Sequence, residues 1–202
     1  MKTTVACVLK SGGDYTASDV AALQARIAVH LPGADFVCLS DVDVPCRRIP
    51  LEQGWPGWWS KIELFRPDIA GKLLYVDLDT VPVGDLTDLA KIRKTAIMRD
   101  VYRPDGLQSA VMVIPQAAKA EIWNAFTADP AGNMAACTVR WSKWGDQGFI
   151  EQFWTNKAAR LQDLLPGQIV SWKADRIAET GVPADARLIV FHGRPRPTDV
   201  GY

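Results

Sequence analysis

Two aspartates separated by one residue are the sharpest chemical feature of the sequence. Asp77 and Asp79 directly follow an apolar run, residues 72–76 (KLLYV), which is typical of a buried strand. Side chains at positions i and i+2 of an extended chain project to the same side, so the two carboxylates converge on one point. Such a pair repels itself unless a cation neutralises it, and oxygen ligands at this spacing suit Mg²⁺ or Mn²⁺.

The aspartate pair has two alternatives to a Mg²⁺ or Mn²⁺ site. A calcium loop of the EF-hand type is excluded because Val81 and Pro82 stand where that loop needs an oxygen-bearing residue and a glycine. The aspartates could also simply end the strand and cap the next element. Their place after a buried strand, where open α/β sheets put their ligands, favours the metal.

A histidine stands in a comparable position near the end of the sequence. His192 follows the apolar run 188–191 and precedes Gly193. Imidazole complements carboxylates at Mn²⁺, and glycine lets the backbone approach a ligand closely. Arg194 and Arg196 come next, and guanidinium groups offer several directed donors to phosphate oxygens. The alternatives are a hydrogen-bonded surface histidine and a solvated basic tail.

An alternation of strands and helices must position these residues. Residues 3–9 and 35–40 are apolar and β-rich, and between them Ser18 can cap a helix that runs to Leu31. This unit of about 35 residues is long enough for a right-handed parallel crossover. Beyond it the sequence predicts helices over 58–65, 86–92, 117–126 and 146–154, and strands over 72–76, 95–98, 109–114, 169–172 and 188–191. We expect a mixed, mostly parallel α/β sheet with helices on both sides.

Composition limits the classes of function. The chain has 202 residues, of which 48% are hydrophobic, and no linker or repeat divides it, so we expect one domain. Lys plus Arg and Asp plus Glu both total 23, so no overall charge would hold a nucleic acid or an acidic membrane. The apolar run at the start of the sequence is too short for a signal peptide or a membrane span, so we expect a cytoplasmic protein. The four cysteines include no CxxC pair, so we expect reduced thiols.

Several segments together resemble glycosyltransferase family 8 and its relatives with the GT-A fold. The resemblance is carried by residues 59–65 (WSKIELF) and 72–86 (KLLYVDLDTVPVGDL), followed in the family's order by 108–114 (QSAVMVI), 144–147 (WGDQ) and 191–193 (FHG). It implies a single GT-A domain over residues 1–202, with a nucleotide-binding half at about 1–80 and an acceptor-side half at about 81–202. The sequence departs from the family at 108–110, which read Gln-Ser-Ala instead of Asn-Ala-Gly, and at 194–197, which read Arg-Pro-Arg-Pro instead of Lys-Pro-Trp.

The resemblance also implies roles for individual residues. Asp77, Asp79 and His192 would hold a divalent metal, Mn²⁺ or Mg²⁺, that bridges the diphosphate of a nucleotide sugar. Asp146 and Gln147 would face the transferred sugar as catalytic residues. The residues expected at the donor are Leu9, Lys10, Ser11, Asp14, Lys61, Asp77, Leu78, Asp79, Gly193, Arg194 and Arg196.

The resulting hypothesis is a metal-dependent hexosyltransferase that uses a nucleotide-diphosphate donor, a UDP-sugar on resemblance, and retains the configuration of the sugar. Its acceptor is not identified by the sequence. Two further functions fit the same features. A sugar-phosphate nucleotidyltransferase usually carries a glycine-rich, basic phosphate loop after its first strand, whereas this loop is SGGDY with only Lys10 before it. A nucleotide-sugar binding module without catalysis would keep the metal ligands and show no turnover.

Two assignments within this hypothesis stay open. Asp146 either faces the sugar or caps the helix that begins after it. Among the eight tryptophans, Trp58 and Trp59 are expected to belong mainly to the core, whereas Trp141 and Trp144 are candidates for the acceptor side because indole rings stack on the apolar faces of sugars.

Overall fold

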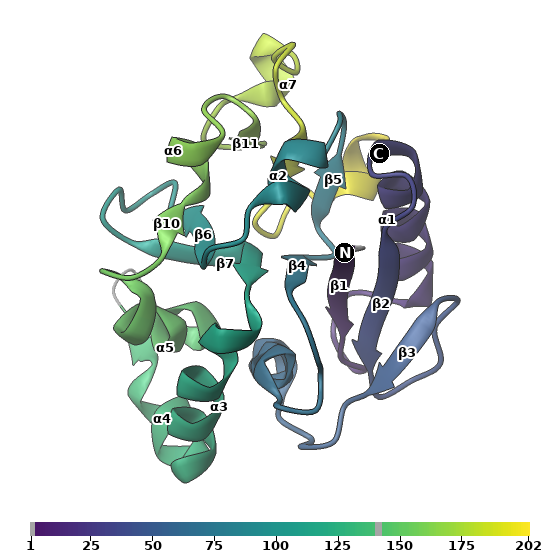
Figure 1. Cartoon of the computed structure of the whole chain (residues 1–202). Coiled ribbons are helices and arrows are strands. Elements are labelled where there is room, and N and C mark those ends of the chain that lie inside the picture. The colour runs from purple at the N-terminus through teal and green to yellow at the C-terminus, as the bar shows by residue number, and fades with distance from the viewer. Residues whose placement is uncertain (1–2, 140–142) are drawn as a thin grey trace.

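The amino-terminal strand-helix-strand unit forms as its hydrophobic pattern predicts. The computed structural model describes residues 3–139 and 143–202 (Figure 1). Strands β1 (Thr4–Leu9) and β2 (Asp35–Ser40) pair in parallel, with α1 (Ala17–His30) as the crossover between them. The buried residues of α1, Val20, Leu23 and Ile27, recur at three- and four-residue spacing, which puts them on one face of the helix.

The predicted cap of α1 is wrong by two residues. The helix is capped by Thr16, whose hydroxyl accepts a hydrogen bond from the backbone N–H of Ser18, while the Asp19 carboxylate accepts one from the backbone N–H of Thr16. This reciprocal pair is a capping box, which satisfies backbone donors at both ends of the first turn. Ser18 therefore lies inside the first turn.

The main sheet has the order β10-β6-β7-β4-β1-β2-β3. Within the described residues, β7 alone runs antiparallel to both of its neighbours, and the remaining pairs are parallel. The expected mixed, mostly parallel α/β sheet is therefore confirmed. The strands not yet given bounds are β3 (Arg47–Pro50), β4 (Leu73–Val76), β6 (Ala96–Arg99), β7 (Leu107–Ile114) and β10 (Ala159–Arg160).

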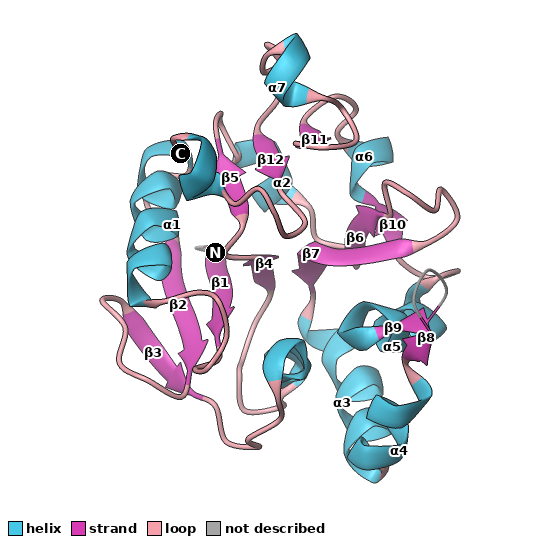
Figure 2. Cartoon of the chain, turned by 180° about the vertical axis from the view of Figure 1, so that it is seen from behind, coloured by secondary structure: helices cyan, strands magenta, loops and turns pink. Residues whose placement is uncertain are grey.

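Helices cover both faces of this sheet, and a separate hydrophobic cluster lies under each layer. One cluster joins α1, α2 (Thr87–Lys91) and α6 (Leu161–Leu164) to the strands, and the other joins η1 (Gly57–Phe65), α3 (Lys119–Ala128) and α5 (Gly145–Trp154) to them. Alternate residues of β1 point to opposite layers, with Val5 and Cys7 in the first cluster and Ala6 in the second. Figure 2 shows α3, α4 (Pro130–Ala136) and α5 grouped at one end of the molecule.

The carboxyl-terminal strands build a second, smaller sheet. The predicted strands at 169–172 and 188–191 become β11 (Ile169–Ser171) and β12 (Leu188–Val190), which form a sheet with β5 (Thr80–Pro82) in the order β11-β12-β5. Because β12 pairs antiparallel with β5, Val190 lies opposite Thr80. The end of β12 therefore meets the aspartate pair that precedes β5. The remaining elements are η2 (Gln116–Ala118), β8 (Thr138–Val139), β9 (Lys143–Trp144), α7 (Ile177–Thr180) and η3 (Pro197–Val200).

Two expectations drawn from composition can be compared with the structure. The structure holds all four cysteines as free thiols, of which Cys7, Cys38 and Cys137 are buried and Cys46 is partly exposed. Among the helices in the described part of the chain, none combines the length and apolar character needed to cross a bilayer.

Candidate functional site

The site forms where β4 ends and β7 begins. Asp77 directly follows β4, and its backbone N–H donates to the carbonyl oxygen of Ala110 at 2.8 Å. Because β7 is antiparallel to β4 and Val76 pairs with Val111, the residues that follow β4 run alongside the beginning of β7, where Gln108 and Ser109 stand. The end of β4 and the start of β7 therefore contribute side chains to the same site.

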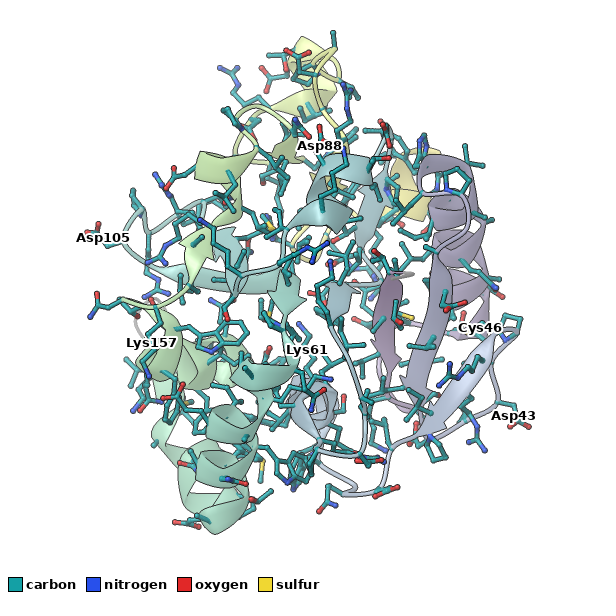
Figure 3. All side chains as sticks on the ribbon, viewed as in Figure 1. Asp43, Cys46, Lys61, Asp88, Asp105 and Lys157 are labelled. Carbon is teal, nitrogen blue, oxygen red and sulfur yellow. The ribbon has the colours of Figure 1, made fainter. Side chains whose placement is uncertain are left out.

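Lys61 stands between two carboxylates at this place. Its Nζ lies 3.0 Å from the Asp77 carboxylate and 3.7 Å from Oδ2 of Asp146. Ser109 completes the group, because its hydroxyl donates to Oδ2 of Asp146 at 2.7 Å and lies 3.4 Å from Lys61 Nζ. Lys61 comes from η1, and Figure 3 shows it near the middle of the molecule. The cluster thus joins η1, β4, β7 and α5.

The protonation of this cluster follows from its burial and its charges. Burial raises the pKa of both Asp77 and Asp146, and the Lys61 cation opposes that rise. Burial alone would lower the pKa of Lys61, but the carboxylates of Asp146 and Asp77 outweigh it and raise that pKa above its ordinary value. Lys61 is therefore a cation at neutral pH, and it offsets the cost of burying two carboxylates side by side.

Tyr75 is a site residue that the sequence pattern did not single out. Its hydroxyl donates a hydrogen bond to Oδ1 of Asp77, and its ring lies under the Lys61 ammonium group, 5.7 Å from the centroid. A signal was available, because Tyr75 precedes Asp77 by two residues and residues at that spacing share one side of an extended chain. The tyrosine holds one oxygen of Asp77 and so fixes the orientation of that carboxylate.

His192 reaches the aspartate pair through the antiparallel pairing of β12 with β5. The backbone N–H of Phe191 donates to the carbonyl oxygen of Asp79 at 3.2 Å, and that of Gly193 donates to its carboxylate at 3.3 Å. His192 between them has a φ of 54°, in the left-handed region that side-chain-bearing residues rarely adopt. The small sheet therefore holds His192 in a strained turn beside Asp79.

The imidazole of His192 has one satisfied and one unsatisfied nitrogen. Nδ1 lies 2.5 Å from the side-chain amide of Gln108, whereas Nε2 is buried and has no hydrogen-bond partner among the described residues. Burial and the nearby Lys173 cation lower the pKa of His192 to about 4, so the ring is neutral at pH 7. A neutral imidazole with an unused nitrogen is a suitable metal ligand.

These residues line two adjoining cavities. A smaller cavity of about 180 Å³ is lined by Lys61, Asp77, Asp79, Asp146, Gln147 and His192, together with residues of β7 and two tryptophans. A larger one of about 530 Å³ is lined by Leu9, Lys10, Asp14, Tyr15 and Leu78, among others. Trp58, Lys61, Asp77 and Asp79 line both. The residues expected at the sugar and those expected at the nucleotide are therefore neighbours.

Four of the expected donor residues lie outside these two cavities. Among the described residues, Ser11, Gly193, Arg194 and Arg196 line neither of them. The Ser11 backbone and hydroxyl both donate to Asp41, at 2.8 and 2.6 Å, and Lys10 also binds that carboxylate. The first strand's loop is thus held to Asp41.

The two arginines of the tail differ in their surroundings. Arg196 donates to the backbone carbonyl of Asp14 at 2.8 Å, also pairs with its carboxylate, and lies 5.2 Å from the centroid of the Tyr15 ring. Arg194 is exposed and lies 3.5 Å from the Asp199 carboxylate. Arg196 therefore ties the tail to the loop after β1 at the edge of the larger cavity.

The donor set can be tested for its fit to a divalent metal. In residues 3–139 and 143–202, no group of three or more His, Cys, Asp or Glu side chains is placed to hold a metal ion. Asp77 is engaged by Lys61 and Tyr75, whereas Asp79 and the unsatisfied Nε2 of His192 share the wall of the smaller cavity. One imidazole nitrogen and carboxylate oxygens are donors that suit Mn²⁺. The donor types therefore suit the ion, whereas their arrangement in the described residues does not form a metal site.

Gln108 explains how this imidazole could be held as a ligand. Its Oε1 atom is buried and also has no partner within the described part of the chain. Rotating the amide by 180° would bring Oε1 to Nδ1 of His192, which could then donate its proton and leave the lone pair on Nε2. Metal-binding histidines commonly donate their second N–H in this way.

The assignments left open for Asp146 and the tryptophans can now be compared with the coordinates. The cap of α5 is Trp144, without a side-chain hydrogen bond, and Asp146 lies one residue inside the helix. The capping interpretation of Asp146 is therefore wrong. Trp59 is buried as expected, but Trp58 is 47% exposed, so its assignment to the core is wrong. Trp141 lies outside the described residues.

Several solved structures with this fold are glycosyltransferases. GlyE from Streptococcus pneumoniae TIGR4 superimposes with a TM-score of 0.67 at 16% identity, over 97% of this chain and 56% of GlyE. An active-site mutant of LgtC gives 0.66 at 10% identity, over 96% of this chain and 89% of LgtC. The galactosyltransferase LgtC in complex with donor and acceptor sugar analogues gives 0.64 at 9% identity.

The comparisons by sequence found nothing further: no family model and no curated protein matches this chain. The structural likeness covers nearly the whole chain, which spans little more than half the length of GlyE. At these identities the likeness is one of fold. The chain has the GT-A glycosyltransferase fold.

Proposed function

We propose that this protein is a metal-dependent hexosyltransferase that moves a sugar from a nucleotide-diphosphate donor, a UDP-sugar, to an acceptor. One observation carries the proposal: Asp77, Asp79, Asp146 and His192, from widely separated parts of the chain, line one small cavity in a GT-A fold. A neighbouring larger cavity opens at the carboxyl ends of β1 and β4, where α/β sheets bind nucleotides.

In this proposal each of the two cavities binds a different part of the donor. The larger cavity takes the nucleoside, with Leu9, Leu78 and the ring of Tyr15 as apolar walls. The smaller cavity takes the sugar, beside Asp146 and Gln147. The diphosphate then lies between them, next to Asp79 and His192, which line the shared region and the smaller cavity respectively.

The metal ligands in this proposal are Asp79, Nε2 of His192 and a free lone pair of Asp77. When bound, Mn²⁺ or Mg²⁺ supplies Lewis-acid stabilisation of the charge that grows on the departing diphosphate. Lys61 keeps Asp77 and Asp146 in place and neutralises part of their charge. Without such neutralisation, the carboxylates would repel the donor phosphates.

The transfer is proposed to retain the configuration at the anomeric carbon. The bond from that carbon to the phosphate oxygen breaks, and its electron pair leaves with the diphosphate. The acceptor hydroxyl attacks from the same side, and its proton passes to the departing phosphate oxygen. Asp146, held by Lys61 and Ser109, faces the positive charge that develops on the sugar, and Gln147 orients a sugar hydroxyl.

Thermal unfolding with nucleotides tests this proposal. A ligand that binds only the folded state at 100 times its Kd adds about 2.7 kcal/mol of stability. We expect UDP to raise the Tm with MnCl₂ more than without it, and to exceed GDP and CTP. Asp79→Asn and His192→Gln should each remove the manganese-dependent part, while the Tm without ligand stays close to that of the wild type.

Turnover in the same samples separates the possible functions. Slow hydrolysis of a UDP-sugar identifies an enzyme, whereas binding with no hydrolysis would leave a binding module. Release of pyrophosphate from UTP and a sugar phosphate would replace our proposal with a nucleotidyltransferase. No manganese-dependent shift with any nucleotide would overturn it.

A further inference from the structure

The loop between β6 and β7, residues 100–106, is folded around one buried carboxylate. Asp100 is 7% exposed, and its Oδ1 atom accepts hydrogen bonds from the backbone N–H groups of Tyr102 at 2.9 Å and Arg103 at 3.2 Å. Its own backbone N–H donates to the carbonyl oxygen of Gly106 at 3.0 Å, and the Gly106 N–H donates to the carbonyl oxygen of Arg103 at 2.7 Å. The loop is therefore a closed, internally bonded turn.

Arg103 fastens this turn to α5. Its Nε lies 3.0 Å from the Asp100 carboxylate, and its Nη2 lies 3.0 Å from the carboxylate of Glu151. The Oε1 atom of Glu151 also accepts a hydrogen bond from the backbone N–H of Leu107 at 3.1 Å. None of the three charged side chains is more than 24% exposed, and charge-assisted bonds of this kind are the strong ones. One guanidinium thus joins the loop to the helix that carries Asp146.

The loop brings Tyr102 to the ring of His192. The two ring centroids are 6.4 Å apart with an angle of 65° between the planes, which is an edge-to-face contact. Tyr102 is 50% exposed, so its position follows from the loop backbone more than from burial in a core. Gln108, two residues beyond the loop, contacts Nδ1 of the same imidazole at 2.5 Å. Side chains on both sides of Arg103 in the sequence therefore contact the His192 ring.

The imidazole needs this support from outside its own turn. His192 has a φ of 54°, and the next residue, Gly193, has no side chain to pack against it. Its Nε2 atom has no hydrogen-bond partner among the described residues, so that nitrogen does not fix the ring. The groups around a ligating histidine commonly set the orientation of its ring. The residues that contact the ring therefore decide where Nε2 points.

We propose that Arg103 and Tyr102 are positioning residues for His192. The ion pairs of Arg103 with Asp100 and Glu151 fix the loop, and the loop holds Tyr102 against the imidazole, so that Nε2 keeps one orientation at the smaller cavity. This inference rests on the proposed function, because it takes His192 as a ligand of the metal.

One helix then positions two parts of the site. α5 carries Asp146, which is proposed to face the sugar, and five residues later Glu151, which acts on the imidazole through Arg103. Sites whose groups are held by rigid elements keep their geometry better than sites on independent loops. The spacing between the sugar side and the imidazole side is therefore set by α5.

Two measurements on the full chain test this inference. The first is NMR of the imidazole nitrogens without any ligand, which is simple to read because the chain has only two histidines. The signals of His192 are the ones that His192→Gln removes. The second is the Mn²⁺ affinity measured by calorimetry at saturating UDP.

Substitutions in the loop should move both measurements. Tyr102→Ala should shift the His192 signals and weaken Mn²⁺ binding about 10-fold, the lower end of the usual effect of losing a ligand's supporting partner. Arg103→Gln should do the same although Tyr102 is still present. Tyr102→Phe keeps the ring and should bind Mn²⁺ within about twofold of the wild type.

A control from the same loop separates positioning from general disturbance. Asp105 is exposed, and Figure 3 shows it at the outer edge of the molecule. Asp105→Asn should leave the His192 signals and the Mn²⁺ affinity as in the wild type. Tyr102→Ala changes a half-exposed position, so it keeps the test valid if Arg103→Gln fails to fold.

The outcomes distinguish this inference from the function on which it rests. If the wild type binds Mn²⁺ with UDP and folded Tyr102→Ala and Arg103→Gln bind it equally well, the positioning role is overturned while the proposed function stands. Lower stability of these variants with unchanged His192 signals shows a merely structural loop and also overturns it. If the wild type binds no Mn²⁺ with UDP, the proposed function fails and this inference fails with it.

Discussion

Lys61 is the cation on which the buried part of the site depends. It lies within 4 Å of the carboxylates of both Asp77 and Asp146, and its side chain is 15% exposed. Removing one partner from a buried ionic group leaves the other charges uncompensated, which costs more than the pair contributed. This dependence can be measured without knowing any substrate.

We therefore predict that Lys61→Met lowers the free energy of unfolding by about 3–5 kcal/mol. Urea unfolding at pH 7 measures the loss. The matched control is Lys157→Met, because Lys157 pairs with Glu121 in an exposed position and surface ion pairs contribute only about 0–1 kcal/mol. Equal effects of the two substitutions would contradict the proposed role of Lys61.

Gln108 provides a second test, through His192. If the side-chain oxygen of Gln108 accepts a hydrogen bond from the Nδ1–H of His192, this bond keeps the lone pair of His192 on Nε2. Gln108→Leu then removes the group that keeps that lone pair available. Loss of such a supporting partner typically costs about 10- to 100-fold in metal affinity. We expect this decrease in the Mn²⁺ affinity measured with UDP by calorimetry. Unchanged affinity would show that the amide does not support the histidine.

The sequence singled out the chemically distinctive residues that the structure brings to one cavity, but it did not single out their supporting partners. Asp77 and Asp79 are marked by the strand before them, and His192 by its place after an apolar run. Ser109 received no role, because its contact with Asp146 needs β7 to run antiparallel to β4. That pairing joins residues far apart in sequence, and hydrophobic periodicity does not specify it.

At the scale of elements, α1 shows what local patterning does and does not specify. The spacing of Val20, Leu23 and Ile27 predicted the helix and its buried face. It did not distinguish Thr16 from Ser18 as the cap, because both residue types are favoured there. Residues 58–65 form a 3₁₀-helix rather than an α-helix, and no local pattern in the sequence signals that difference.

The cap can be tested by a pair of substitutions. Thr16→Ala removes the side-chain acceptor of the capping box and should destabilise the protein by about 1 kcal/mol. Ser18→Ala leaves the box intact and should change stability by less than about 0.5 kcal/mol. Thermal unfolding of the two variants gives the comparison, and a larger loss for Ser18→Ala would contradict the assignment.

The buried amine of α3 makes stability depend on alkaline pH. Lys119 is 1% exposed and donates to the carbonyl of Ile69, and burial lowers its pKa to about 8 despite the nearby Asp68 carboxylate. The unfolded chain, with the ordinary value near 10.5, binds more protons between these two pH values. Stability contributed by this group must therefore rise with pH across that window.

Lys119→Met removes the titrating group and should remove this rise. Between pH 8 and 10 the wild type should gain on the order of 2 kcal/mol relative to the variant. Urea unfolding at several pH values measures the difference, and Lys157→Met reports any general effect of losing an exposed lysine. A constant difference between wild type and Lys119→Met across this range would show that Lys119 titrates normally.

Across the whole molecule, the fold class was predictable, but the sheet that the carboxyl-terminal strands join was not. Alternating strands and helices implied a mostly parallel α/β sheet, which is confirmed. The strands at 169–172 and 188–191 were expected to complete the same pattern, yet they form a second sheet with β5. Short apolar strands carry no information about which sheet they join.

The tail after β12 connects distant parts of the molecule. Tyr202 packs on Trp172 and Phe191 of the small sheet and contacts Arg26 of α1, while Arg196 binds Asp14. These contacts bridge the small sheet and the loop after β1. Arg196 is therefore the polar link between the tail and the edge of the larger cavity.

We predict that Arg196→Ala increases the rate of proteolytic cleavage within the tail severalfold under native conditions, because local opening controls cleavage. Arg194→Ala is the matched control, since Arg194 is exposed and pairs with Asp199 of the same tail. Mass spectrometry of a limited digest with proteinase K, which has little sequence preference, locates the cuts. Identical digestion of the two variants would show that Arg196 does not hold the tail.

The pairing of β12 with β5 has a consequence for the order of events during synthesis. β12 is the last strand in the sequence, and the imidazole it delivers comes from a turn that forms only once this strand has docked. A nascent chain can build the first parallel strands early, because domains form as their amino-terminal parts emerge. In a chain made from its amino terminus, His192 therefore joins Asp79 only after residues 188–193 have emerged and docked on β5.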